Sequence, residues 1–177
     1  MAGKLKKGIV QVYTGNGKGK TTAAFGQAVR ASGAGLEVSI VQFLKDSRSS
    51  EVQAVRRAMP GIKVYCFGRT GFVNPSSPSD QDVRQALRGL EKCREILEYD
   101  CPDVLVLDEI CTAVSLGLIG EDAVLRFLQM RPGNVEFVLT GREATPGIIG
   151  AADLVTEMRE VKHPFSLGQS ARKGIEY

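Results

Sequence analysis

The fold is decided by the stretch Thr14-Gly15-Asn16-Gly17-Lys18-Gly19-Lys20-Thr21-Thr22. An apolar, β-prone run precedes it at residues 9–13, and a helix-prone run follows it at residues 22–30. A strand, a glycine-rich turn and a helix in this order are the setting of a phosphate-binding loop. Glycines let the backbone turn tightly and point successive N–H groups at an anion, and the helix N-terminus adds unpaired N–H groups and a positive dipole end. We therefore predict that the chain binds a nucleoside triphosphate.

Each residue of this loop has an expected role in ATP binding. Lys20 supplies a mobile cation for the phosphates, and the Thr21 hydroxyl is placed to hold Mg²⁺. The usual pattern, G-x-x-x-x-G-K-[ST], has a glycine where this chain has Thr14, so we expect Gly15 to take over the turn and Lys18 to add a second cation. The expected ATP-binding residues of the loop are Gly15, Asn16, Gly17, Lys18, Gly19, Lys20, Thr21 and Thr22. The alternative, a turn that holds no ligand, is disfavoured because its two lysines would then repel each other.

Outward from the loop, apolar runs alternate with helix-prone runs. Strands are expected at residues 9–13, 38–44, 62–67, 104–109, 135–140 and 153–158. Helices are expected from near Lys20 to Gly33 and at residues 51–58, 80–97 (capped by Ser79), 113–119, 121–129 and 145–152. Such alternation predicts an α/β fold, with a mostly parallel sheet covered by helices on both faces. We expect a single-domain P-loop NTPase fold of the RecA-like kind over residues 1–177, with residues 1–7 as a flexible basic arm.

Composition narrows the class of protein. The 43% apolar and 24% charged content is that of a soluble globular protein, and no run is apolar enough for a membrane span or a signal peptide. We therefore expect a cytoplasmic protein with no membrane partner. A net charge of +3 is too small to indicate nucleic-acid binding. The four cysteines have no metal-binding spacing, which predicts reduced, mostly buried thiols. The basic arm is read as a solvated tail, with folding over a neighbouring active site as the other possibility.

Two carboxylates follow the apolar strand at residues 104–107. Asp108 and Glu109 stand where a second acidic element beside the triphosphate orders Mg²⁺, directly or through water. The predicted Mg²⁺ ligands are Thr21 with Asp108 or Glu109, and the sequence does not separate the two acids. An acidic turn with no metal role is the alternative reading.

The longest segment without periodicity is residues 68–78. Loops of this length inside a compact domain are usually functional or disordered. Its aromatic residue, Phe72, lies among glycines, which suits either a flat ligand or a fold back onto the core.

Three blocks together resemble one family, the P-loop corrinoid adenosyltransferases, which act on cob(I)alamin or cob(I)yrinic acid a,c-diamide. The first block is the loop with the following helix, residues 14–26, and the second is the strand end at residues 106–109. The third is the segment at residues 139–142 together with the tail blocks at 152–158, 161–164 and 171–177. The Gly-Asn-Gly-Lys-Gly-Lys-Thr form of the loop is more specific than a general phosphate-binding loop.

The resemblance implies a transferase. A cobalt(I) corrinoid attacks the 5′ carbon of ATP, a cobalt–carbon bond forms, and inorganic triphosphate leaves. The implied catalytic residues are Lys20, Glu109 and Phe72; Arg142 joins the ATP-binding residues, and Gln42, Lys45 and Phe72 line the corrinoid pocket. Mg²⁺ is the implied cofactor, a flavodoxin- or flavin-type reductase the implied electron donor, and a homodimer the implied assembly. His163 is read as structural and not as a general base.

One departure from the family pattern concerns the long loop. Family members carry Gly-Phe-Thr-Trp, whereas this chain has Gly71-Phe72-Val73-Asn74 and no tryptophan. In the family, the aromatic pair is thought to displace the lower axial ligand of the corrinoid, so the handling of that ligand is in question here. Two other functions stay open on the residues alone: a P-loop kinase or ATPase that acts at the γ-phosphate, and a RecA-like nucleic-acid binding module.

Overall fold

The computed structural model of the chain describes residues 5–69, 71, 73–74, 77–164 and 168–176. Over these residues the strands form one sheet in the order β3-β2-β4-β5-β1-β6, and every neighbouring pair is parallel. The strands are β1 (Val10–Thr14), β2 (Val38–Phe43), β3 (Ile62–Phe67), β4 (Val104–Asp108), β5 (Glu136–Thr140) and β6 (Leu154–Glu157). The sheet is therefore wholly parallel, where a mostly parallel one was predicted.

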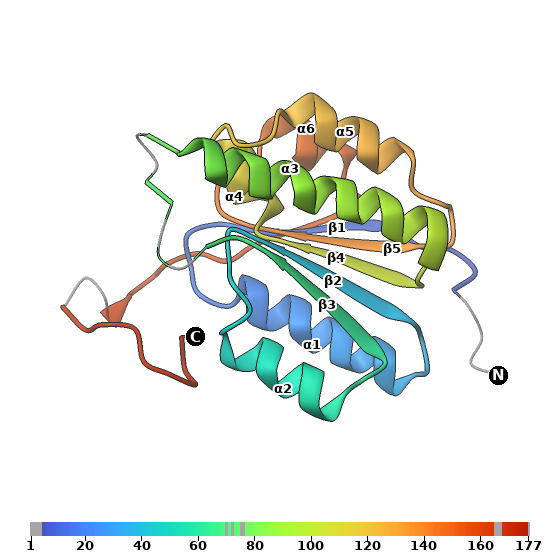
Figure 1. Ribbon diagram of the computed structural model, residues 1–177, viewed down its shortest axis with the longest axis horizontal. Coiled ribbons are helices and arrows are strands. Elements are labelled where there is room, and N and C mark those ends of the chain that lie inside the picture. Colours follow the sequence, from blue (N-terminus) through green and yellow to red (C-terminus); the bar gives the residue numbers. More distant parts are fainter. Residues whose placement is uncertain (1–4, 70, 72, 75–76, 165–167, 177) are drawn as a thin grey trace.

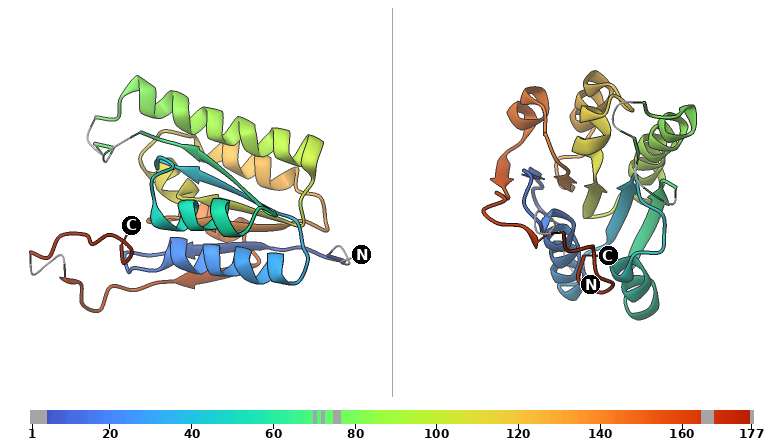
Figure 2. Two further views of the ribbon diagram at one scale, coloured as in Figure 1. Left: turned by 60° about the horizontal axis from the view of Figure 1, so that its bottom comes forward. Right: turned by 90° about the vertical axis from the view of Figure 1, so that its left-hand side faces the viewer.

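Helices cover both faces of this sheet, as the alternation of runs predicted. One face carries α1 (Lys20–Gly33) and α2 (Ser50–Ala58). The other face carries α3 (Asp80–Glu95), α4 (Ile110–Ser115), α5 (Glu121–Gln129) and α6 (Pro146–Ala151) (Figures 1 and 2). Each face encloses its own apolar core, and strands β2, β4 and β5 are buried along their whole length. Strands buried on both faces of a sheet are expected to be continuous apolar runs. This explains why these three strands could be predicted from the sequence.

Two helical segments differ from the sequence predictions. The helix predicted at residues 113–119 is α4, which begins at Ile110 and ends at Ser115. It begins early because Glu109 adopts a left-handed conformation, φ 67°, that turns the chain straight out of β4. The helix predicted at 80–97 is α3, which begins as predicted and continues into a π-helical turn, η1 (Ile96–Asp100), that ends at Cys101 with φ 41°. The predicted Ser79 cap is confirmed: its side chain accepts a hydrogen bond from Asp82 N, and Ser79 N donates one to the Asp82 carboxylate.

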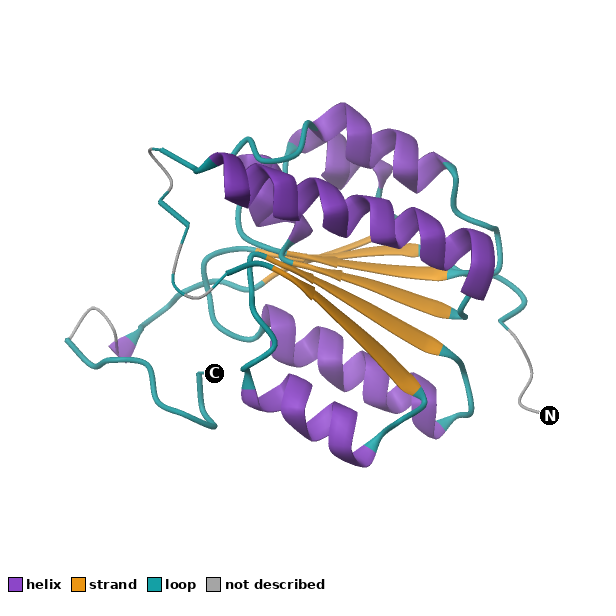
Figure 3. Cartoon of the chain, in the orientation of Figure 1, coloured by secondary structure: helices purple, strands orange, loops and turns teal. Residues whose placement is uncertain are grey.

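The parallel strands place all the predicted site loops at one edge of the sheet. The loops after β1, β2, β4 and β5 gather at the carboxyl edge, where open α/β sheets bind ligands (Figure 3). The described end of the basic arm lies at the opposite edge, where Gly8 N donates to Gly133 O at 2.9 Å. Residues 5–8 therefore do not cover the site of their own chain.

The prediction of reduced, mostly buried thiols is confirmed in part. All four cysteines are free thiols; Cys93 and Cys111 are buried, whereas Cys66 and Cys101 are only partly buried. Within the described ranges, no helix has both the length and the apolar character to cross a membrane.

Candidate active site

The glycine-rich loop turns from β1 into α1 as predicted. Thr14 is the last residue of β1, and Gly15, with φ 96°, makes the turn that a glycine at position 14 would otherwise make. Gly19, with φ 119°, is the N-cap of α1. The N–H groups of the first turn of α1 lack acceptors within the helix and are free for an anion. Both residues have a left-handed backbone conformation, which residues other than glycine rarely adopt.

Lys20 lies inside this loop. Its Nζ donates to the carbonyl oxygens of Gly15 at 2.5 Å and Gly17 at 2.7 Å, so the ammonium joins both sides of the turn. Burial lowers the pKa of Lys20; the charge of Glu109 opposes this effect, and Arg142 adds to it. The nearness of these charges shows that Lys20, Glu109 and Arg142 share one electrostatic environment.

Met158, the residue directly after β6 (Leu154–Glu157), supports the loop through its backbone. Met158 N donates to Thr14 O at 2.8 Å, and Gly17 N donates to Met158 O at 2.7 Å. A Cβ atom at Gly15 or Gly17 would stand 2.5 Å or 2.7 Å from Met158 O. These glycines are therefore required for packing as well as for turning. The expectation that successive loop N–H groups point at the anion is wrong for Gly17, because its N–H is bonded to Met158.

Asp108 is the centre of the polar network at this edge. Its side chain is fully buried, and its Oδ1 accepts from Thr21 Oγ1 at 2.9 Å and from Thr140 Oγ1 at 2.7 Å. Its Oδ2 accepts from Gln42 Nε2 and from Lys45 Nζ, both at 2.9 Å. Burial alone would raise the pKa of Asp108, but the charge of Lys45 and these hydrogen bonds outweigh it and lower the pKa. The carboxylate is thus held ionised beside the phosphate-binding loop.

Lys45 brings a positive charge to the same network. Its Nζ lies 2.7 Å from Thr21 Oγ1, 2.9 Å from Asp108 Oδ2 and 3.7 Å from Glu109 Oε1. Burial lowers the pKa of Lys45, but the two carboxylates and the hydrogen bond to Asp108 outweigh burial and raise the pKa.

Two threonines fix Glu109, and neither had a role assigned from the sequence. Glu109 N donates to Thr140 Oγ1 at 2.9 Å, and the same hydroxyl donates to Asp108. Thr112 Oγ1 donates to Glu109 Oε2 at 2.6 Å and accepts from Arg142 N at 2.9 Å. The hydroxyls connect the ends of β4 and β5 and the start of α4. Their only signal in the sequence is their position: Thr140 ends the predicted strand at residues 135–140, and Thr112 lies just before the predicted helix at residues 113–119.

Arg142 stands at the rim of the site. It follows Gly141, where an added Cβ would lie 2.5 Å from Thr112 N, so the loop after β5 packs closely on the start of α4. The next residues return to the phosphate-binding loop, since Ala144 N donates to Thr14 Oγ1 at 3.1 Å. The Arg142 residue itself is exposed.

The site thus joins a glycine-rich phosphate-binding loop to a buried carboxylate from a neighbouring part of the sheet. The sequence model of the family described as ATP:corrinoid adenosyltransferase BtuR/CobO/CobP matches residues 6–177 of the chain. The chain belongs to this family.

Named relatives agree with this membership. The chain is 38% identical to a corrinoid adenosyltransferase of Pseudomonas aeruginosa, over 97% of this chain and 85% of that protein. It is 36% identical to the corrinoid adenosyltransferase CobA of Salmonella typhimurium and 34% identical to a corrinoid adenosyltransferase of Escherichia coli. Each of these two comparisons covers 97% of this chain and 87% of the relative. The family resemblance found in the sequence is confirmed.

In this adenosyltransferase, Gln42 was predicted to contact the corrinoid, but the structure places its side chain elsewhere. Its side chain is fully buried, its Nε2 donates to Asp108, and its Oε1 faces Cys66 Sγ at 3.6 Å. It offers no exposed surface to a large ligand. Phe72 lies outside the described residues. Its neighbour Val73 packs against the core, and Arg69 bonds to Asp82 of α3 through Nε–Oδ1 at 2.7 Å.

The tail of the adenosyltransferase chain reaches the phosphate-binding loop, which composition did not reveal. Glu176 Oε1 lies 3.2 Å from Lys18 Nζ, and Arg172 pairs with the same carboxylate at 3.0 Å. The lysine expected on the triphosphate therefore has a carboxylate partner here. Arg172 N–H and side-chain donors lower the pKa of Glu176 to about 2.

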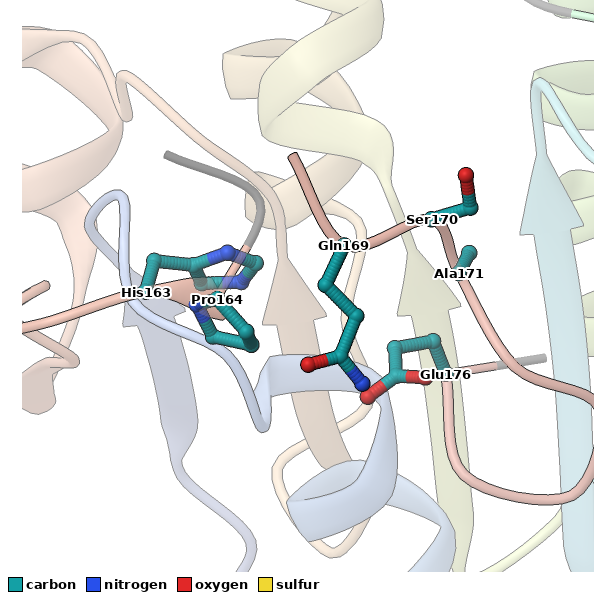
Figure 4. A pocket seen from close by; sticks show the side chains of 6 residues that line it. All are labelled: His163, Pro164, Gln169, Ser170, Ala171 and Glu176. Atoms are coloured by element: carbon teal, nitrogen blue, oxygen red, sulfur yellow. The ribbon is translucent and has the colours of Figure 1, made fainter. Parts of the chain in front are cut away.

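A small cavity of about 60 Å³ lies within this tail (Figure 4). His163 lines it beside Pro164, and the Gln169 amide points toward the Glu176 carboxylate. The cavity is too small for a nucleotide. A larger hollow of about 480 Å³ lies between α5, α6 and the start of β1, at the edge of the sheet away from the phosphate-binding loop. Neither hollow is the expected ATP pocket, which is an open cradle of backbone.

The donor atoms at the loop fit Mg²⁺ better than a soft metal. Thr21 Oγ1 and the carboxylate oxygens of Asp108 and Glu109 are hard oxygen ligands, which Mg²⁺ prefers. Over the described part of the chain, no group of three or more His, Cys, Asp or Glu side chains is placed to hold a metal ion. A cation at this site therefore needs phosphate oxygens or water to complete its coordination.

Proposed function

We propose that this chain transfers the 5′-deoxyadenosyl group of ATP to cobalt(I) of a corrinoid and releases triphosphate. The observation that carries the proposal is the contact of Thr21, at the start of α1, with the buried Asp108 at the end of β4. It joins a phosphate-binding loop to a carboxylate in a chain whose family is defined by adenosyl transfer from ATP to corrinoids.

The loop is proposed to bind the whole triphosphate. Lys20 and the N–H groups at the start of α1 face the phosphates, with Gly15, Asn16, Gly19 and Thr22 shaping the cradle. Gly17 supports the loop through Met158. Lys18 exchanges its Glu176 partner for phosphate, and Arg142 approaches from the loop after β5.

In the proposed reaction, cobalt(I) donates an electron pair to the 5′ carbon of ATP. The cobalt–carbon bond forms as the bond between that carbon and its phosphate oxygen breaks, and the pair in the broken bond leaves with triphosphate. The leaving group gains negative charge, so Lys20 and Lys18 accelerate the step by stabilising it. Cobalt becomes formally cobalt(III), and no proton needs to be moved.

We assign the metal ligands to Thr21 and Asp108, with Glu109 adjacent. Asp108 is favoured for direct contact because its Oδ1 already meets the Thr21 hydroxyl, whereas Glu109 is held by Thr112. When bound, Mg²⁺ would neutralise charge on the triphosphate. Glu109 is proposed to act from the rim of the same site.

For the corrinoid we propose Lys45 and Phe72 as contacts, and we reassign Gln42. Because the Gln42 amide is buried against Asp108, its proposed role is to position that carboxylate. The wider setting stays a proposal from the family: a cytoplasmic homodimer that receives electrons from a flavodoxin- or flavin-type reductase and acts on cobalamin or cob(I)yrinic acid a,c-diamide.

The decisive experiment mixes the protein with Mg·ATP and a chemically reduced corrinoid. We expect a light-sensitive cobalt–carbon absorbance and an equal amount of triphosphate. Lys20→Ala should abolish both, whereas Lys63→Ala, which removes an exposed ion pair between Lys63 of β3 and Asp100 of η1, should leave both unchanged. Production of ADP with no cobalt–carbon bond would assign the chain to kinase or ATPase chemistry and overturn the proposal.

A further inference from the structure

We infer that Lys45 is a resident counter-cation of the metal site, so that the metal ion enters with the nucleotide and not before it. This inference rests on the proposed function in one respect, namely that Thr21, Asp108 and Glu109 form the metal site. It changes the role of Lys45 from a corrinoid contact to a group that holds the site in the absence of nucleotide.

The first support is geometric. One ammonium group contacts an oxygen of each of the three residues assigned to the metal: 2.7 Å to Thr21, 2.9 Å to Asp108 and 3.7 Å to Glu109. Its side chain is 30% exposed, so it reaches inward from the surface to a carboxylate that is fully buried. The ammonium therefore stands where a divalent ion would meet the same oxygens.

The second support is the backbone that delivers Lys45. Leu44 has φ 62°, a left-handed conformation that is strained for a non-glycine residue. The bend is held because Leu44 N donates to Phe67 O at 2.8 Å, and because Gly68 packs against it. A Cβ at Gly68 would stand 2.3 Å from Lys45 N. Two neighbouring strands thus hold a strained turn whose effect is to aim Lys45 back into the site.

The third support is the charge of the site. A buried carboxylate without a partner is strongly destabilising, and Lys45 is the cation that pairs with Asp108. A divalent ion that arrives alone must displace the ammonium and meets its repulsion at close range. ATP brings several negative charges, which are enough to hold both cations. Binding of the metal by the free protein is therefore weak, and binding of the metal with ATP is not.

The test measures Mn²⁺ binding to the nucleotide-free protein by electron paramagnetic resonance. We expect weak binding to the wild type and binding at least about tenfold tighter to Lys45→Met, because a repelling charge is removed. Asp108→Asn in the Lys45→Met background should remove the gain. Lys63→Met is the matched control, since it removes one lysine from an exposed ion pair and should not change Mn²⁺ affinity. Lys45→Gln, which keeps a donor for Asp108, replaces Lys45→Met if thermal unfolding shows that variant to be unfolded.

The outcomes separate this inference from the proposed function. Unchanged or weaker Mn²⁺ binding in the Lys45 variant overturns the inference, and so does a gain that survives Asp108→Asn. Neither result bears on whether the wild type makes the cobalt–carbon bond, which the corrinoid assay measures by itself. If the wild type forms no cobalt–carbon bond but the Lys45 variant binds Mn²⁺ more tightly, the proposed function is overturned. The inference about Lys45 then still holds.

Discussion

Thr140 joins the two carboxylates of the site through a single hydroxyl group. It is fully buried, donates to Asp108 Oδ1 and accepts from Glu109 N. The hydroxyl thus orients one acid and fixes the left-handed turn that presents the other. Outer hydrogen bonds of this kind usually matter for activity nearly as much as the ligands they orient.

We expect Thr140→Val to lower kcat for adenosyl transfer about 10–100-fold, because Asp108 and Glu109 lose their common partner. The free energy of unfolding should fall by about 1–3 kcal/mol, since Glu109 N is left without an acceptor. Thr140→Ser keeps the hydroxyl and should retain most of the wild-type kcat. Full kcat in Thr140→Val, which keeps the methyl group, together with a loss in Thr140→Ser would show that the methyl group, and not the hydrogen bonds, matters.

Phe72 is a second residue whose role can be tested. Only the family resemblance assigns it a role, which is to displace the lower ligand of the corrinoid. If it displaces the lower ligand of the corrinoid, Phe72→Ala should reduce the rate more with cobalt(II) and a reductase than with pre-reduced cobalt(I). Parallel assays of the two reactions, with Val73→Ala as a control from the same loop, measure the difference. Equal losses in the two assays would refute the role.

At the scale of elements, α3 rests on β2 at a glycine. A Cβ on Gly89 would lie 2.7 Å from Cε1 of Phe43, whose ring is fully buried. The helix therefore approaches the sheet more closely than an alanine would permit.

Gly89→Ala should lower the free energy of unfolding by about 1–3 kcal/mol, because the added methyl group overpacks the contact. Gly26→Ala is the matched control in another helix, where an added Cβ meets nothing within 4 Å. It should raise stability by about 0.4–1 kcal/mol through the unfolded state. Urea unfolding of both variants provides the comparison, and a stabilised Gly89→Ala would mean that α3 can shift.

The long loop is tied to α3 by Arg69 and Asp82. The side chain of Asp82 is buried, and the Arg69 guanidinium and the Ser79 hydrogen bonds hold the pKa of Asp82 well below its usual range. The stabilisation is therefore complete above about pH 4, the pKa of an unfolded aspartate, and is lost as pH falls below it.

Asp82→Asn should remove this pH-dependent part of stability. Between about pH 4 and pH 2 the wild type should lose stability more steeply than the variant, as measured by urea unfolding at each pH. Glu91→Gln is the control, because its ion pair with Arg94 is exposed on the same helix. Parallel curves for Asp82→Asn and the wild type would contradict the prediction.

The sequence predicted most of the elements but only part of the site. Strands buried on both faces and the glycine-rich loop carry strong local signals, so β2, β4 and the start of α1 were placed within one residue or so. Contacts between residues that are distant in the sequence leave no local signal. The pairing of Lys18 with Glu176, the support of Gly17 by Met158 and the burial of Gln42 depend on how the sheet brings remote segments together. Lys45 was predicted at the site, but its contacts with Thr21, Asp108 and Glu109 were not, because the direction of its side chain depends on the left-handed Leu44.

At the scale of the molecule, the site combines segments from the whole length of the chain. Mg·ATP should therefore stabilise the entire fold, by about 2.7 kcal/mol at a concentration 100 times its Kd. Lys20→Ala should show no such gain in thermal unfolding. Duplex DNA should give none with either protein, since the net charge is only +3. Stabilisation by DNA, but not by Mg·ATP, would favour a nucleic-acid binding module.

The backing of the loop by Met158 has a consequence for how the protein matures during translation. The glycine-rich motif leaves the ribosome first, but β1 pairs with β5 and β6, and Gly17 takes its acceptor from a residue near the end of β6. A nascent chain that stops before this point contains the entire motif and still lacks the strands that shape it. Nucleotide capture must therefore wait for the last third of the polypeptide to emerge.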